Sequence, residues 1–209
     1  MGPRIIKRGS ARAALLEAAL QQFHLRGFQG TGLNDIMAGA GVTKGSLYHH
    51  FSSKTELGYA VLDEIVGPWA IAHWVEPLKE SESAVDGVLR VLHTTTTTDL
   101  QPIGSYSVTL ERGCMLLNLS QEMSPLDSGF RTRIKAIFDT WRRTIALMLA
   151  RDQGAGRVRG DIDPEAAATF IVASLEGALS LTKNAQDQGL LEQCTQELGR
   201  YVTSLRAPQ

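Results

Sequence analysis

The side chains best suited to chemistry gather in one short stretch, and that chemistry is binding. Residues 43–49 contain a threonine, a lysine, a serine, a tyrosine and a histidine. Hydroxyl and ammonium groups donate hydrogen bonds to phosphate oxygens and to base edges. A glycine in the same stretch, Gly45, would let another molecule approach the backbone closely. We interpret this stretch as a surface for a polyanion.

The remaining reactive side chains lack the spacing of a catalytic or metal centre. The chain has no HExxH, GxSxG or P-loop motif, and Cys114 and Cys194 do not form a CxxC pair. His49 and His50 are adjacent, which is not a metal-ligand spacing. We therefore expect no catalytic residue, no metal and no cofactor.

Composition is that of a folded protein with an uneven charge distribution. The 209 residues are 43% hydrophobic and carry a net charge of −1. The first 56 residues hold seven basic and three acidic side chains, so a basic N-terminal segment precedes an acidic remainder. No apolar run reaches the ~18 residues of a membrane span. We expect a cytoplasmic protein with no membrane partner.

The hydrophobic periodicity predicts an all-α fold. Apolar residues recur at three- and four-residue steps, and strand-like alternation is absent. Ser10, Thr43, Ser53 and Asp163 are expected as N-caps. Pro68 is expected to kink or end the fourth helix. The expected helices cover residues 10–26, 33–40, 44–49, 54 onward, 84–92, 106–121, 128–151, 164–186 and 190–205.

Two of these short helices form a predicted helix-turn-helix. Gly41 lies between residues 33–40 and 44–49, where a sharp turn requires a positive φ. Ile36, Val42 and Leu47 are spaced to pack between the two helices. The polar residues then remain on the outer face of the second helix, as DNA recognition in the major groove requires.

The segment Gly41-Val-Thr-Lys-Gly-Ser-Leu-Tyr-His-His-Phe-Ser-Ser-Lys-Thr-Glu-Leu57, together with Phe23, Gly27-Phe28 and Thr31, resembles the signature of the TetR/AcrR family of transcriptional regulators. The resemblance implies a helix-turn-helix domain over residues 1–56 and a ligand-sensing, dimerising domain over 57–209. It implies a sequence-specific DNA-binding regulator, usually a repressor, that binds a palindromic operator. By position, the residues expected to face double-stranded DNA are Thr31, Thr43, Lys44, Gly45, Ser46, Tyr48, His49 and Lys54.

Three positions depart from the family pattern. Gly32 stands where serine or threonine usually caps the second helix. Met37 replaces a small alanine, and Asn34 replaces a common arginine. These differences predict a weaker cap, an altered helix crossing and a weaker phosphate contact, respectively.

The resemblance also implies a homodimer held by long helices. Two apolar stripes, on the helices expected over 128–151 and 164–186, are the predicted interface. Two-fold symmetry then requires half-sites about one DNA turn apart. The interface residues are Ile134, Trp141 and Ile145 on the first helix, and Phe170, Ser174, Ala178 and Leu181 on the second.

The signal is expected to be a small apolar or electrophilic effector. A cavity for it could be lined by Trp69, His73, Tyr106, Asn118, Phe138 and Trp141. Cys114 is a second candidate, because it begins an apolar helix beside Arg112, and a helix N-terminus favours the thiolate. Some family members respond to electrophiles or oxidants through a cysteine in a similar segment. A packed, unreactive cysteine is the other interpretation.

Two other function classes stay open at this point. A helix-turn-helix can serve as an adaptor that acts through protein contacts alone. A small helical enzyme is a further alternative, although no catalytic motif supports it. Salt dependence separates these classes, since binding through several phosphates weakens steeply with salt.

Overall fold

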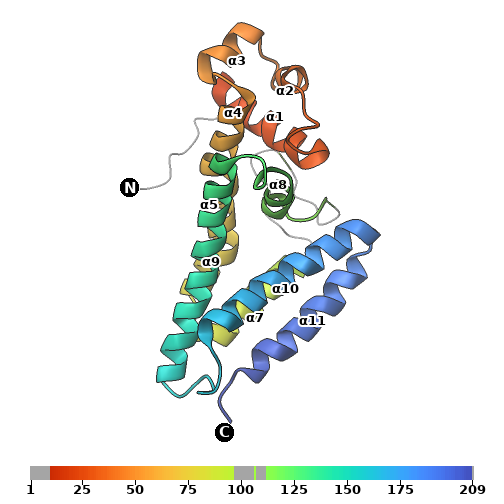
Figure 1. Cartoon of the computed structure of the whole chain (residues 1–209). Coiled ribbons are helices and arrows are strands. Elements are labelled where there is room, and N and C mark those ends of the chain that lie inside the picture. Colours follow the sequence, from red (N-terminus) through yellow and green to blue (C-terminus); the bar gives the residue numbers. More distant parts are fainter. Residues whose placement is uncertain (1–9, 97–105, 107–111, 209) are drawn as a thin grey trace. The chain divides into compact units, whose positions relative to one another are not determined.

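The computed structural model describes residues 10–96, 106 and 112–208. Within them the regular elements are helices, and an isolated antiparallel bridge joins Val158 and Arg206. Figure 1 shows the helices in chain order. The all-α prediction is therefore confirmed. No helix of the described part is long and apolar enough to cross a membrane.

The N-terminal helices begin where their caps predict. These are α1 (Ala11–Arg26), α2 (Leu33–Ala40), α3 (Lys44–His50) and the start of α4 (Lys54–Val61). Ser10, Thr43 and Ser53 each accept a hydrogen bond from the backbone amide three residues later. Glu56 reaches one residue further back than a capping box requires, and accepts from the amide and hydroxyl of Ser52.

The helical run that begins at α4 continues past both of its prolines. It passes through η1 (Leu62–Val66), α5 (Gly67–Ala70), η2 (Ile71–Val75) and α6 (Glu76–Lys79), and the two η segments are π-helical. Gly67 and Glu76, which directly precede Pro68 and Pro77, each donate to a carbonyl five residues back. A proline ring clashes with the carbonyl four residues back, and the wider turn accommodates that ring. Pro68 therefore does not end the helix.

The described chain divides into two compact units. The first holds α1–α4, η1, α8 (Met115–Met123) and the first turns of α9 (Ser128–Gly154). The second holds η2, α6, α7 (Ala84–Thr96), the rest of α9, α10 (Pro164–Ala185) and α11 (Gln188–Ser204). The predicted boundary between residues 56 and 57 separates a DNA-binding from a regulatory domain, and it stays a prediction.

The helix expected over 106–121 begins later than predicted. Tyr106 is not helical, Gly113 has a left-handed φ of 70°, and α8 starts only at Met115. The left-handed Gly113 turns the backbone just before α8 begins. Apolar periodicity does not reveal such a turn. The other predicted helices agree within about four residues, and Asp163 caps α10 as expected.

Candidate nucleic-acid interface

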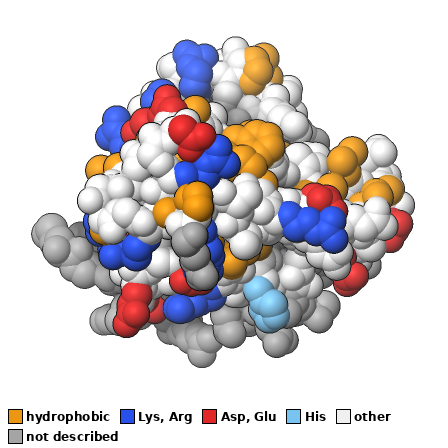
Figure 2. Space-filling model, turned by 90° about the horizontal axis from the view of Figure 1, so that it is seen from below, with side chains coloured by type: hydrophobic (Ala, Val, Ile, Leu, Met, Phe, Trp, Pro, Cys, Tyr) orange, Lys and Arg blue, Asp and Glu red, His pale blue; other side chains and the backbone are white. Residues whose placement is uncertain are grey.

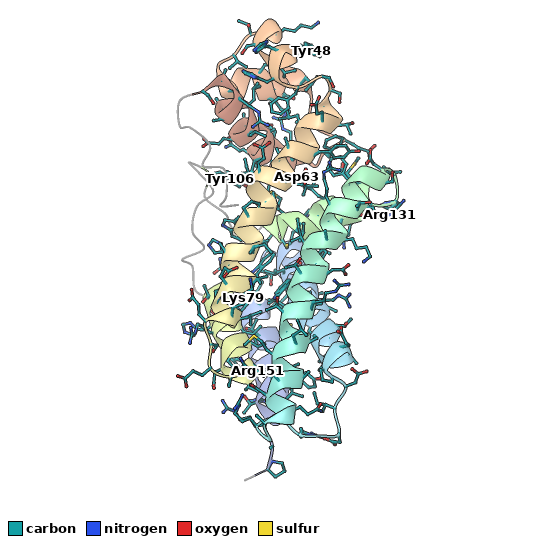
Figure 3. The ribbon with its side chains drawn as sticks, turned by 90° about the vertical axis from the view of Figure 1, so that its left-hand side faces the viewer. Tyr48, Asp63, Lys79, Tyr106, Arg131 and Arg151 are labelled. Atoms are coloured by element: carbon teal, nitrogen blue, oxygen red, sulfur yellow. The ribbon has the colours of Figure 1, made fainter. Side chains whose placement is uncertain are left out.

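The outer face of α3 is polar and its inner face is buried. Leu47 is fully buried, whereas Thr43, Lys44, Gly45 and His49 are exposed. Tyr48 keeps 48% of its surface exposed, and Figure 3 shows it at the outer end of the N-terminal helices. An exposed tyrosine beside a lysine offers one hydroxyl and one ammonium for phosphate contacts.

Two glycines shape this helix pair in different ways. Gly41 has a φ of 64°, so it makes the left-handed turn that the sequence predicts between α2 and α3. Gly45 has no such constraint. A β-carbon built on it would meet nothing closer than the Thr43 hydroxyl at 4.0 Å. Packing within the chain therefore does not require glycine at position 45.

Thr31 and Lys54 were expected to face DNA, but both make hydrogen bonds inside the protein. Thr31 is 1% exposed, and its hydroxyl donates to the carbonyls of Gln22 and Gly27. The Lys54 ammonium donates to the Thr31 carbonyl at 2.6 Å and lies 4.6 Å from the Phe28 ring centre. Burial lowers the Lys54 pKa, and the charge of Glu122 opposes this. Both residues hold the loop between α1 and α2. The buried Thr31 hydroxyl is unavailable to DNA, which corrects its predicted role, whereas a DNA contact of the half-buried Lys54 stays a prediction.

The sequence analysis missed two acidic residues that anchor this loop and α4. Glu122 of α8 accepts hydrogen bonds from the amides of Phe28 and Gln29 at 2.8 and 2.7 Å. Asp127 caps the start of α9 and accepts the Tyr59 hydroxyl at 2.7 Å. The contacts of Glu122 and the Tyr59 contact of Asp127 have no local signal, because these partners lie more than 65 positions away in the chain. The cap that Asp127 gives to the Phe130 amide is local, and an aspartate before a predicted helix was the signal that could have found it.

The residues predicted to sense a signal divide between the two compact units. Trp69, Tyr106 and Asn118 belong to the first, and His73, Cys114, Phe138 and Trp141 to the second. The Tyr106 hydroxyl lies 2.9 Å from Nδ1 of His24 on α1. Trp141 stacks on Trp74 with ring centres 4.6 Å apart. The second unit therefore contains a stacked pair of buried tryptophans, Trp74 and Trp141.

One buried acid in the second unit was missed. Glu176 of α10 is 5% exposed, and neither carboxylate oxygen has a hydrogen-bond partner among the described residues. Burial raises the Glu176 pKa to about 7, and the Cys114 thiol opposes that rise. The only available sequence signal was a charged residue on the apolar side of the predicted helix.

Half of the predicted dimer stripe belongs to the protomer core. Ile134, Trp141 and Ile145 of α9 are each at most 2% exposed, so they are unavailable to a partner. On α10, Ala178 is 3% exposed, whereas Phe170 and Leu181 are 51% and 54% exposed. These two line a groove of about 510 Å³ together with α11, which lies beside α10 in Figure 1. Its other lining residues include Ser174, Ala178, Cys194, Leu198 and Tyr201.

Charges are mixed on the face drawn in Figure 2. Basic and acidic side chains alternate there without a broad field of one sign. In the second unit, ion pairs such as Arg206–Asp86 and Arg159–Asp161 place opposite charges next to each other. A surface that binds DNA needs an excess of positive charge. The mixed charges therefore argue against this face as the DNA-binding surface and leave α3 as the candidate.

Comparison with known proteins agrees with this geometry. Residues 15–61 match the model of bacterial regulatory proteins of the tetR family, and residues 104–198 match a tetracyclin repressor-like C-terminal domain. The transcriptional repressor DhaR of Mycobacterium sp. (strain GP1) is 32% identical over 89% of both chains. The chain belongs to the TetR family of transcriptional regulators.

Further TetR-family relatives cover almost the whole chain. The transcriptional regulator AcuR of Cereibacter sphaeroides is 29% identical over 93% of this chain and 86% of its own. The crystal structure of a TetR regulator from Chloroflexus aurantiacus superposes with a TM-score of 0.83 at 28% identity. It covers 95% of this chain and 97% of that one. The protein is thus a DNA-binding transcriptional regulator of a family that is not enzymatic.

Proposed function

We propose that the protein is a homodimeric repressor that binds a near-palindromic operator through α3 and leaves it when an effector binds the C-terminal part. The exposed face of α3 supports this proposal most directly. Among the described residues, the hydrogen bond shown for its side chains is the Thr43 cap, and the Lys44 ammonium lies 5.9 Å from the Tyr48 ring centre. Thr43, Lys44, Gly45, Ser46, Tyr48 and His49 form the proposed DNA-contacting set. The protein would act in the bacterial cytoplasm, associated with the nucleoid when bound.

The proposed partner for the groove between α10 and α11 is a second copy of this chain. Phe170 and Leu181 expose apolar surface that a symmetric copy would bury. A two-fold axis there would present two α3 helices to successive turns of one DNA face. The effector would act by changing the spacing of these helices, with the run from α4 to α6 as the connecting element.

Two forms of signal are proposed for the effector. A small apolar ligand could bind without a covalent bond in the second unit, beside the Trp74–Trp141 stack. An electrophile could instead modify Cys114. Titration of DNA release with N-ethylmaleimide, on the wild type and Cys114→Ser, separates them, because only covalent sensing needs the thiol.

Operator binding tests the DNA-contacting set directly. The DNA fragment upstream of the protein's own gene would be labelled, and its affinity measured by anisotropy at several salt concentrations. Lys44→Ala should lower affinity for all sequences and reduce the salt slope by about one. Tyr48→Phe should weaken binding about three- to tenfold, since one hydrogen bond is lost.

Lys79→Ala is the matched control, because Lys79 lies on α6 and pairs with Glu76. It should leave the salt slope unchanged. Wild-type affinity in a folded variant carrying both α3 substitutions would overturn the assignment of α3. Binding without salt dependence would favour the adaptor alternative.

A further inference from the structure

The loop between α1 and α2 is shaped around the carboxylate of Glu122. One carboxylate oxygen accepts the Phe28 amide at 2.8 Å and the other accepts the Gln29 amide at 2.7 Å. Gly27, directly before them, has a left-handed φ of 76°, and a β-carbon there would come within 2.9 Å of a Glu122 oxygen. Both the turn and the close approach of the carboxylate therefore require glycine at position 27.

Lys54 of α4 holds the carbonyl groups of the same loop. Its ammonium donates to the Thr31 carbonyl at 2.6 Å and to the Gln29 carbonyl at 3.4 Å. Glu122 lies close enough for its charge to oppose the effect of burial, which lowers the Lys54 pKa. The loop backbone is thus bound on its amides by a carboxylate and on its carbonyls by an ammonium.

The start of α2 depends on this loop. Its N-cap is Gly32, which has no side chain to accept a hydrogen bond from the first amides of the helix. At the other end of α2, Val42 donates to the Met37 carbonyl at 3.1 Å, which ties the turn before α3 to α2. A change in the loop would therefore displace α2 and carry α3 with it.

We propose that Glu122 is a positioning residue for operator binding, which holds the α1–α2 loop in the conformation that presents α2 and α3 to DNA. This inference rests on the proposed binding of the operator through α3. In it, Glu122 acts through two backbone amides and does not contact DNA. Operator affinity would then depend on a residue of α8, which lies within the residues 104–198 that match the C-terminal family domain.

The charge of Glu122 makes the expected effect distinctive. Removing an acid near a DNA-binding surface ordinarily strengthens binding, because a carboxylate repels phosphates. A positioning role predicts the opposite sign. If only one-tenth of the molecules keep the competent loop conformation, the apparent affinity falls tenfold. The salt slope counts phosphate contacts, so it should stay as in the wild type.

Glu122→Gln tests this role with almost no change in side-chain volume. The new NH₂ group would face a backbone amide, so one of the two hydrogen bonds is lost, and a hydrogen bond to a charged group is worth about tenfold. Anisotropy with the DNA fragment upstream of the protein's own gene should show about tenfold weaker binding and an unchanged salt slope. Asp63→Asn is the control, because Asp63 belongs to the same compact unit and pairs with Arg133 away from the loop. Equal or tighter binding by a folded Glu122→Gln variant would overturn the inference.

Hydrogen exchange of the Phe28 and Gln29 amides tests the wild type without a substitution. By linkage, operator binding must tighten the Glu122 contact by the factor by which that contact raises affinity. Exchange of these two amides should therefore slow about tenfold when the operator is added. A role confined to folding would leave their exchange unchanged, and that result would also overturn the inference.

Failure of the proposed function gives a different result. If Lys44→Ala left affinity and salt slope unchanged while Glu122→Gln weakened binding, the assignment of α3 would be wrong and the positioning role of Glu122 would stand. If Lys44→Ala weakened binding and Glu122→Gln did not, only the role of Glu122 would be lost.

Discussion

Gly45 shows how an exposed residue can be explained by what binds outside the protein. Glycine weakens a helix interior relative to alanine, and nothing inside the chain needs the missing β-carbon at position 45. The proposed reason is the close approach of DNA to the α3 backbone. The same residue would then lower stability and raise affinity.

We therefore expect opposite effects from Gly45→Ala. The free energy of unfolding should rise by about 0.5–1 kcal/mol, because alanine is the better helix former. Operator affinity should fall, because the methyl group stands between the helix and the groove. Urea unfolding and anisotropy measure the two quantities. Gly154→Ala, which also meets open space, is the control that should leave affinity unchanged; equal affinity in both variants would refute the explanation.

At the scale of elements, hydrogen bonds between distant positions decide where helices start. The carboxylate of Asp152, near the end of α9, is fully buried and accepts the Ala84 amide at 2.6 Å at the start of α7. Arg151 and Arg157 also donate to it. Burial opposes ionisation of Asp152, but these hydrogen bonds outweigh burial and hold its pKa below the usual value.

Asp152→Asn should therefore destabilise the protein by about 2 kcal/mol at pH 7. A lowered pKa contributes stability above the unfolded value of about 3.9, and this is lost as pH falls through the folded value. The difference between the variant and wild type should thus shrink below about pH 4. Thermal unfolding against pH measures it. Asp161→Asn, an exposed partner of Arg159, should change little, and an equal loss there would contradict the argument.

At the scale of the whole molecule, the groove between α10 and α11 is proposed to close against a second copy. Leu181→Glu would place a carboxylate at the exposed edge of this groove. The proposed dimer would bury that carboxylate, and burying an unpaired charge is unfavourable. We expect the variant to sediment as a monomer at micromolar concentration and to lose operator affinity. Leu126→Glu, at a 65% exposed site between α8 and α9, should remain a dimer. A dimeric Leu181→Glu variant would place the interface elsewhere.

The sequence by itself determined the elements whose signals are local. Apolar periodicity, serine and threonine caps and the turn at Gly41 predicted α1 to α3 and the start of α4 within one residue. Ile36 and Leu47 are core and Tyr48 is exposed, because residues on one short helix divide between faces by their spacing alone. The family resemblance followed from the same stretch.

The tertiary structure decided what depends on distant partners. Ile145 and Leu181 are both apolar residues on predicted stripes, yet one is core and the other is exposed, since burial depends on the helices packed around each stripe. Thr31 was predicted to contact phosphate, but its hydroxyl is buried and donates to the carbonyls of Gln22 and Gly27. Glu176 could be recognised only when α10 packed against the turn before α8, because burial and the nearby thiol give an ordinary glutamate its unusual pKa.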